Sequence, residues 1–154
     1  MRIKFNGQLQ RTRVKDPIDG ETRNFSGDLF PDWDWNVEFR HDLKDFSYGF
    51  TVNDRDRFTF FRTDEFDTNF NGGPFGNLYV EYRPRPGTVI KFDVDNAFDT
   101  SGNRNRLRFI PNRAQTDFRI NEFRERNRHL NFGLTLKQSF GSNANNGGGV
   151  AQGG

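Results

Sequence analysis

The 154-residue chain contains no cysteine, which excludes disulfide bonds and thiolate metal sites. It also lacks an excess of either charge, because 23 Lys and Arg residues stand against 21 Asp and Glu residues. Proteins that bind nucleic acid usually concentrate basic residues in a patch or stripe, whereas here acidic residues are interleaved with the basic ones. The charge balance therefore gives no indication of a polyanionic partner, and we expect no nucleic acid.

Long apolar runs are missing as well. No run of about 18 apolar residues occurs, so the sequence offers no transmembrane helix. The mean hydropathy of −0.94 is weak evidence for solubility, because the strands of a membrane β-barrel average out in a hydropathy window. Residues 1–20 do not combine a basic start with an apolar core, so we find no secretory signal and expect a piece of a longer chain.

What the sequence does contain is phenylalanine at regular spacing. Phe supplies 19 residues, while all apolar residues together make up only 32% of the chain. In residues 130–140, apolar side chains alternate with polar residues and glycine, and this period of two predicts a strand long enough to cross a bilayer. The apolar positions of this run are Leu130, Phe132, Leu134, Leu136 and Phe140.

Five further segments have the same period, and we expect strands at about 2–14, 33–40, 46–53, 75–83 and 88–96. A sandwich core favours Val, Ile and Leu, whereas these apolar positions are rich in Phe and Trp. Aromatic-rich apolar residues that alternate with charged ones are typical of an outer-membrane barrel. The predicted lipid-facing residues are Trp33, Trp35, Val37, Phe39, Phe46, Tyr48, Phe50, Leu78, Val80, Tyr82, Ile90, Phe92 and Val94.

The connections between these strands alternate in length. Residues 16–32, 54–74 and 97–128 are expected to be long loops, whereas 42–45 and 84–87 are short turns, as in barrels with long loops on the outer side. Inside the longest loop, residues 106–110 and 117–123 are predicted to pair as a rim hairpin. Residues 141–154 are rich in Gly and Asn, and we expect a disordered tail.

The predicted fold is all-β: an antiparallel up-and-down transmembrane β-barrel segment over residues 1–140, with about six long strands plus the rim hairpin. A closed six-stranded barrel would be only about 12 Å across, too narrow for the charged side chains of the polar face. An open sheet in lipid would leave backbone groups unpaired at both edges. We therefore expect the segment to be part of a larger barrel.

Five short sequence motifs, in their order along the chain, resemble the C-terminal end of TonB-dependent outer-membrane receptors. These motifs lie at Arg13–Arg23, Phe39–Leu43, Val80–Pro84, Phe92–Asp99 and Asn121–Arg126. The resemblance covers about residues 1–140. It implies a location in the outer membrane of a Gram-negative bacterium and a role in TonB-energised uptake of a scarce, siderophore-like ligand. The segment would form barrel wall and external loops, and it would not transport anything alone.

The same resemblance implies partners. These are outer-membrane lipid, the plug and remaining strands of the receptor, the TonB system and the barrel assembly machinery. The strand that ends at Phe140 looks like the terminal signal that this machinery reads.

Candidate binding residues are few. Arg104, Arg106, Arg108 and Arg113 are candidate contacts for an anionic ligand or lipopolysaccharide, and a solvated rim hairpin is the plainer interpretation. His41 and His129 have no obvious second metal ligand nearby in sequence. We expect neither an enzyme nor a cofactor or metal site.

One alternative stays open: a soluble antiparallel β domain that binds a ligand or nucleic acid through stacked aromatics and arginines. Such a platform would place aromatic side chains among the basic ones. Here both Trp residues and most strand Phe residues share a parity with the aliphatic residues. The pattern therefore favours the barrel.

Overall fold

The computed structural model describes residues 1–25, 31–114 and 117–139. Every regular element in these residues is a strand and every strand pair is antiparallel, which confirms the all-β, antiparallel part of the predicted fold. No helix in the same residues is long and apolar enough to span a membrane. The strands are β1 (Arg2–Leu9), β2 (Val14–Lys15), β3 (Thr22–Arg23), β4 (Trp33–Asp42), β5 (Phe46–Arg55), β6 (Phe58–Phe61), β7 (Glu65–Asn71), β8 (Phe75–Arg85), β9 (Thr88–Asp95), β10 (Ser101–Phe109), β11 (Phe118–Asn127) and β12 (Asn131–Gln138).

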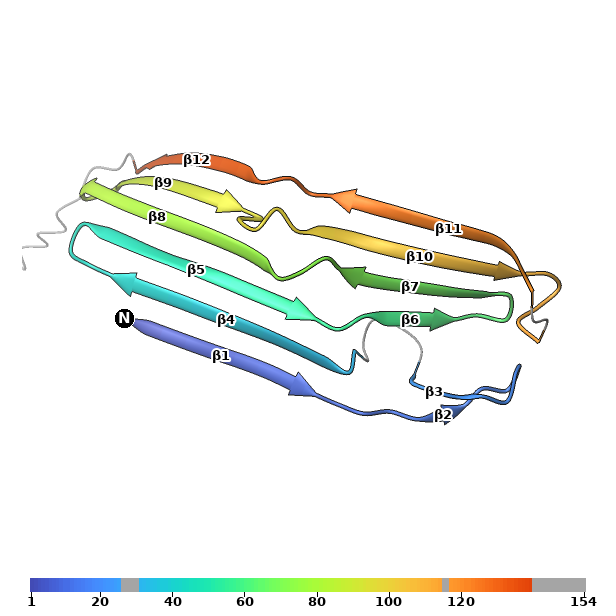
Figure 1. Cartoon of the computed structure of the whole chain (residues 1–154). Helices are drawn as coiled ribbons and strands as arrows, with labels where there is room; N and C mark the ends of the chain where they lie inside the picture. Colours follow the sequence, from blue (N-terminus) through green and yellow to red (C-terminus); the bar gives the residue numbers. More distant parts are fainter. Residues whose placement is uncertain (26–30, 115–116, 140–154) are drawn as a thin grey trace, which may run out of the picture.

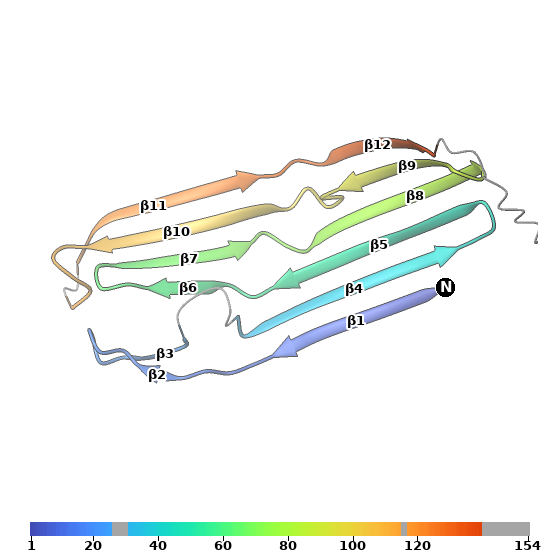
Figure 2. The same cartoon turned by 180° about the vertical axis from the view of Figure 1, so that it is seen from behind.

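The strands form a six-stranded sheet in the order β1-β4-β5-β8-β9-β12, a four-stranded sheet β11-β10-β7-β6 and the small pair β2-β3. The two larger sheets lie end to end in one elongated layer, in which β5 leads into β6 and β7 leads into β8 (Figure 1). No described element covers the six-stranded sheet on the face seen in Figure 1 or on the face seen from behind in Figure 2. The apolar side chains of this sheet therefore have no second layer to pack against.

The six-stranded sheet is open. Its outer strands β1 and β12 each have one neighbour, and within the described residues they do not pair with one another. These two strands lie at opposite edges of the sheet (Figure 1). The described residues thus form no closed barrel, as the narrow diameter of a six-stranded barrel predicts.

The prediction of a loop at 54–74 is wrong. This segment contains β6 and β7, which pair with each other and lie in the chain between the paired strands β5 and β8. Apolar residues alternate only over short, interrupted stretches of these strands, as at Phe58 and Phe60 or at Phe66 and Phe70. Their register comes instead from cross-strand polar contacts and from the pairing of β7 with β10.

The predicted rim hairpin is present and longer than expected, since β10 pairs with β11 from Ser101 to Phe109. The first strand is shorter than predicted. It ends at Leu9, and Val14 belongs to the separate strand β2.

A line of interruptions, here called the seam, separates the two larger sheets. It consists of residues 56–57, 72–74, 96–100 and 128–130. Backbone hydrogen bonds continue across it from the amide of Asp56 to the carbonyl of Trp33 (2.8 Å) and from the amide of Gly72 to the carbonyl of Ser101 (2.9 Å). The seam is therefore ordered, although the strands stop there.

Asn96 holds the seam together. It is buried, and its backbone adopts a φ of 53°. Its side-chain amide donates to the carbonyl oxygens of Thr100 (3.0 Å) and Arg128 (2.7 Å), while its Oδ1 accepts from the amide of Thr100 (2.9 Å). One side chain thus links the end of β9 to the segments that precede β10 and β12.

Candidate functional surface

The pairing register collects the predicted lipid-facing side chains on one face of the six-stranded sheet, here called the apolar face. Directly paired residues point to the same side of a sheet, so consecutive pairs define rows that run across the strands. One row crosses all six strands through Ile3, Phe39, Phe50, Leu78, Val94 and Phe132. Two shorter rows contain Tyr48, Val80, Phe92 and Leu134, and Phe46, Tyr82, Ile90 and Leu136.

The remaining predicted members lie on β4. Val37 is paired with Phe5 and Val52, Trp35 with Gly7, and Trp33 with Leu9. The candidate terminal-signal residues Phe132, Leu134 and Leu136 lie on β12, and Leu130 precedes that strand. Phe140 and the predicted tail 141–154 lie outside the described residues.

The apolar face is open to its surroundings. Leu134 is 77% exposed and Phe5 67% exposed, whereas Phe109 is the one large apolar side chain that is buried in the described part of the chain. Soluble monomers rarely expose contiguous apolar patches beyond a few hundred Å². A sheet whose rows are apolar across six strands therefore requires an apolar covering.

Aromatic side chains link neighbouring strands across this face. The ring of Phe39 on β4 stacks on that of Phe50 on β5, with centroids 5.3 Å apart. Phe46 stacks on Tyr82 with a separation of 4.6 Å. These pairs stabilise the register of the sheet without burying the rings completely.

The opposite, polar face is connected by ion pairs and hydrogen bonds. Ser47 is fully buried, and its hydroxyl donates to Asp42 (2.6 Å) and accepts from Arg83 (2.9 Å). Arg83 also pairs with Glu81 at 2.7 Å. Charges on this face are thus neutralised by neighbours on the same strand, such as Glu81 for Arg83, and the buried hydroxyl of Ser47 joins Arg83 to Asp42.

Tyr79 covers a glycine on the same polar face. A Cβ added to Gly49 would lie 2.8 Å from the Tyr79 hydroxyl and would collide with the carbonyl oxygen of Phe39. Lys91 Nζ lies 5.7 Å from the centre of the Tyr79 ring, and the Arg40 guanidinium lies 5.9 Å from it. Gly49 therefore makes room for a ring that two cations contact.

Three of the four candidate arginines lie along β10 and face acidic side chains. Arg104 makes two bonds to Asp67, from Nε at 2.7 Å and from Nη2 at 2.6 Å. Hydrogen bonds from Arg104 lower the pKa of the Asp67 carboxyl. Arg106 Nε donates to Glu65 at 2.7 Å, and Arg108 lies 3.6 Å from Asp64. Their charges are therefore already partnered within the chain.

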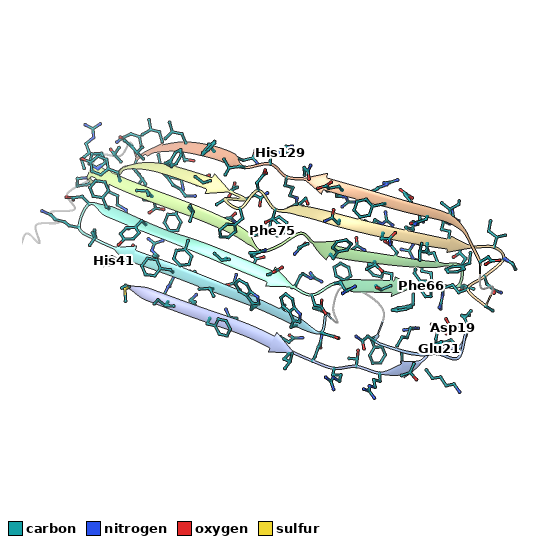
Figure 3. The ribbon with its side chains drawn as sticks, in the orientation of Figure 1. Asp19, Glu21, His41, Phe66, Phe75 and His129 are labelled. Atoms are coloured by element: carbon teal, nitrogen blue, oxygen red, sulfur yellow. The ribbon has the colours of Figure 1, made fainter. Side chains whose placement is uncertain are left out.

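Arg113 is the most enclosed of the four, with 2% of its side chain exposed. It pairs with Asp16 (2.7 Å) and with Asp19 (2.9 Å), both in the β2–β3 turn, and its guanidinium lies 4.8 Å from the centre of the Phe66 ring. Asp19 and Phe66 lie at the end of the layer away from His41 (Figure 3). Arg113 therefore ties the β2–β3 turn to the four-stranded sheet.

Asp16 is the anionic centre of this cluster. Burial alone would raise the pKa of its carboxyl, but hydrogen bonds from Arg23, the amide of Ile18 and Arg113 outweigh burial and hold the pKa well below its usual range. Sequence reasoning missed Asp16, Glu65 and Asp67. The alternating acids of residues 65–67 and the alternating arginines of residues 104–108 were the available signal.

The two histidines serve local contacts. His41 Nδ1 lies 3.0 Å from the hydroxyl of Tyr48, and His129 Nδ1 lies 3.6 Å from Asp99. They lie far apart in the layer (Figure 3). The described residues contain no group of three or more His, Asp or Glu side chains placed to hold a metal ion.

The sequence matches no protein-family model, no curated protein and no solved structure.

Proposed function

We propose that the chain is a wall segment from the C-terminal part of an outer-membrane receptor of the TonB-dependent type. In this role the six-stranded sheet lies in the bilayer with its apolar face toward lipid. The four-stranded sheet and the β2–β3 pair then project outside as extensions of the loops. The complete receptor takes up a scarce ligand, and this segment alone does not transport it.

The observation that carries the proposal is the set of apolar rows. A row of six apolar side chains crosses every strand of the sheet, while the opposite face holds paired charges such as Arg83 and Glu81. Apolar outside and polar inside is the arrangement of an outer-membrane barrel. The short sequence motifs that resemble TonB-dependent receptors support the choice of family.

The open edges of the sheet indicate that a bilayer-embedded form needs further strands. In a bilayer, each unpaired backbone group costs several kcal/mol, so the free edges of β1 and β12 require partner strands. In the proposal, the remaining strands of a larger barrel supply them. In water, the exposed apolar face and the same free edges should make the isolated segment associate or aggregate.

The test compares the purified chain in buffer and in detergent micelles by circular dichroism and light scattering. Strand signal that appears only with micelles, together with aggregation without them, is the expected result. A monomer that is folded in buffer and unfolds cooperatively would instead identify a soluble β domain and would falsify the membrane role.

A further inference from the structure

A polar cavity lies at the seam, beside the end of the apolar face. Its volume is about 480 Å³, within the range of small-molecule sites. Trp33 at the start of β4 and Phe70 on β7 contribute aromatic surface to it, and Asp56 and Arg57 come from the link between β5 and β6. Figure 1 shows these elements meeting where the two larger sheets join. The cavity is distinct from the ion pairs of Arg104, Arg106 and Arg113.

Several polar groups of this cavity have no partner among the residues that the structure describes. Among the described residues, neither the Asp56 carboxylate nor the Arg57 guanidinium makes a hydrogen bond or an ion pair. The Oδ1 atom of Asn105 is buried and accepts no hydrogen bond there. A buried acceptor without a donor is costly, and native structures contain few of them. The cavity therefore presents hydrogen-bonding capacity that the described residues leave unused and that a bound molecule or solvent can use.

The kind of molecule follows from the balance of these groups. The lining holds the carboxylates of Asp54 and Asp56 and the guanidiniums of Arg55 and Arg57, so its charges balance and it does not select an ion of either sign. Acceptors on Asp56 and Asn105, and donors on Arg57 and Asn71, match hydroxyl groups, which both donate and accept. The rings of Trp33 and Phe70 offer apolar surface for the C–H face of a sugar ring.

We infer that this cavity binds a neutral saccharide, either free in solution or as the sugar headgroup of a membrane lipid. Trp33 packs against the sugar ring, while Asp56, Arg57 and Asn105 bond its hydroxyl groups. The inference goes beyond the proposed uptake role, because the cavity adjoins the face assigned to lipid rather than the polar face.

The test uses Trp33 as the reporter. The chain has two Trp residues, so Trp35→Phe leaves Trp33 as the only one. In micelles of a dodecyl polyethylene glycol ether, maltose is expected to protect Trp33 fluorescence from quenching by acrylamide. Asp56→Asn and Arg57→Ala in that background should each raise the half-maximal maltose concentration about tenfold, as expected for loss of a charged hydrogen bond.

Matched controls come from the β4–β5 turn at the other end of the layer. Asp45→Asn and Lys44→Ala alter exposed side chains of the same charge, so they should leave the maltose titration unchanged. Circular dichroism of each variant checks that the strand content is retained. If the chain proves folded in plain buffer, the same titration is done there, so the saccharide result is independent of the membrane role.

A second detergent separates the two sources of sugar. Protection by free maltose that both cavity variants weaken identifies a site for free saccharides. Protection that arises only in dodecyl maltoside micelles, and that the same variants weaken, identifies a site for lipid-linked sugar. Absence of protection in both settings, or protection that neither variant alters, overturns the inference.

Discussion

Asp16 Oδ2 lies 2.7 Å from Nη2 of Arg113, although the two residues are 97 positions apart in the sequence. Both side chains are almost completely enclosed, with 0% and 2% exposed. The contact therefore fixes the β2–β3 turn against the connection that follows β10, and it does so through a charge pair rather than through apolar packing.

Breaking this pair should be costly. Asp16→Asn leaves the Arg113 and Arg23 guanidiniums enclosed without their shared carboxylate, so we expect a loss of about 3–5 kcal/mol in the free energy of unfolding of this region. Urea unfolding in micelles measures the loss. Glu38→Gln is the control, because it breaks an exposed pair with Arg2 and should cost at most about 1 kcal/mol. Equal losses in both variants would contradict the assignment.

The same cluster predicts a pH dependence. The pKa of Asp16 is lower in the folded chain than the value of about 3.9 expected when unfolded, so its stabilising contribution is complete above that value. This contribution is lost as the pH falls through the folded-state pKa. The parent chain should therefore lose stability as the pH is lowered below about 4. Asp16→Asn should show a smaller loss over the same range, and an identical loss would exclude Asp16 as a source.

The two faces of the six-stranded sheet should tolerate charge differently. Phe50→Arg places a cation on the apolar face and should cost about 2–4 kcal/mol in micelles if the residue lies near the bilayer midplane. Thr51→Arg, one position along the same strand, faces the polar side and should cost much less. Urea unfolding in lipid-like micelles compares the two. Equal tolerance would mean that the apolar face does not meet lipid.

The close approach of Tyr79 to Gly49 predicts a steric effect. Gly49→Ala pushes a methyl group into the Phe39 carbonyl and the Tyr79 ring, so we expect a loss of about 1–3 kcal/mol. Gly102→Ala is the matched control, because no atom lies within 4 Å of its added Cβ. Thermal unfolding followed by circular dichroism distinguishes them, and comparable midpoints would show that the ring can move away.

Asn96 combines a strained backbone with three hydrogen bonds, and two variants separate these contributions. Asn96→Gly relieves the positive φ but removes the side-chain bonds, whereas Asn96→Ala removes the bonds and keeps the strain. Both should destabilise the seam, and Ala should cost about 1 kcal/mol more than Gly. Amide hydrogen exchange at Thr100 reports the change. Equal protection in the parent and both variants would contradict the role of Asn96.

The six strands of the larger sheet were predictable because each alternates apolar and polar residues, and the register then follows from matching the apolar faces. The strands beyond the seam were not predictable in this way. Phe58–Phe61 is apolar at three of its four positions, and β7 carries Phe66 and Phe70 on one parity with Thr68 between them, so neither shows the sustained apolar alternation of the six longer strands. Their pairing depends on partners from distant sequence, such as Arg104 with Asp67.

The candidate site was predictable to a similar extent. The members of the apolar face are those expected from parity, because the period of two fixes the face once a strand is assigned. The arginines were identified as a group, but their buried acidic partners were not. A local sequence pattern does not reveal that Asp16 and Arg113 meet, since the contact depends on how two separate hairpins fold back.

The seam also has a consequence for how such a chain can change over generations. On one side of the seam, the register of the six-stranded sheet is set by its own rows of paired residues and by short turns such as the one at Gly87. On the other side, the strands of the four-stranded sheet are joined to those of the six-stranded sheet only through the few seam residues. A hairpin such as β6–β7 can therefore be lengthened, shortened or exchanged without shifting any row of the six-stranded sheet. In the proposed receptor, this separation would let the outer surface diversify while the barrel wall is inherited unchanged.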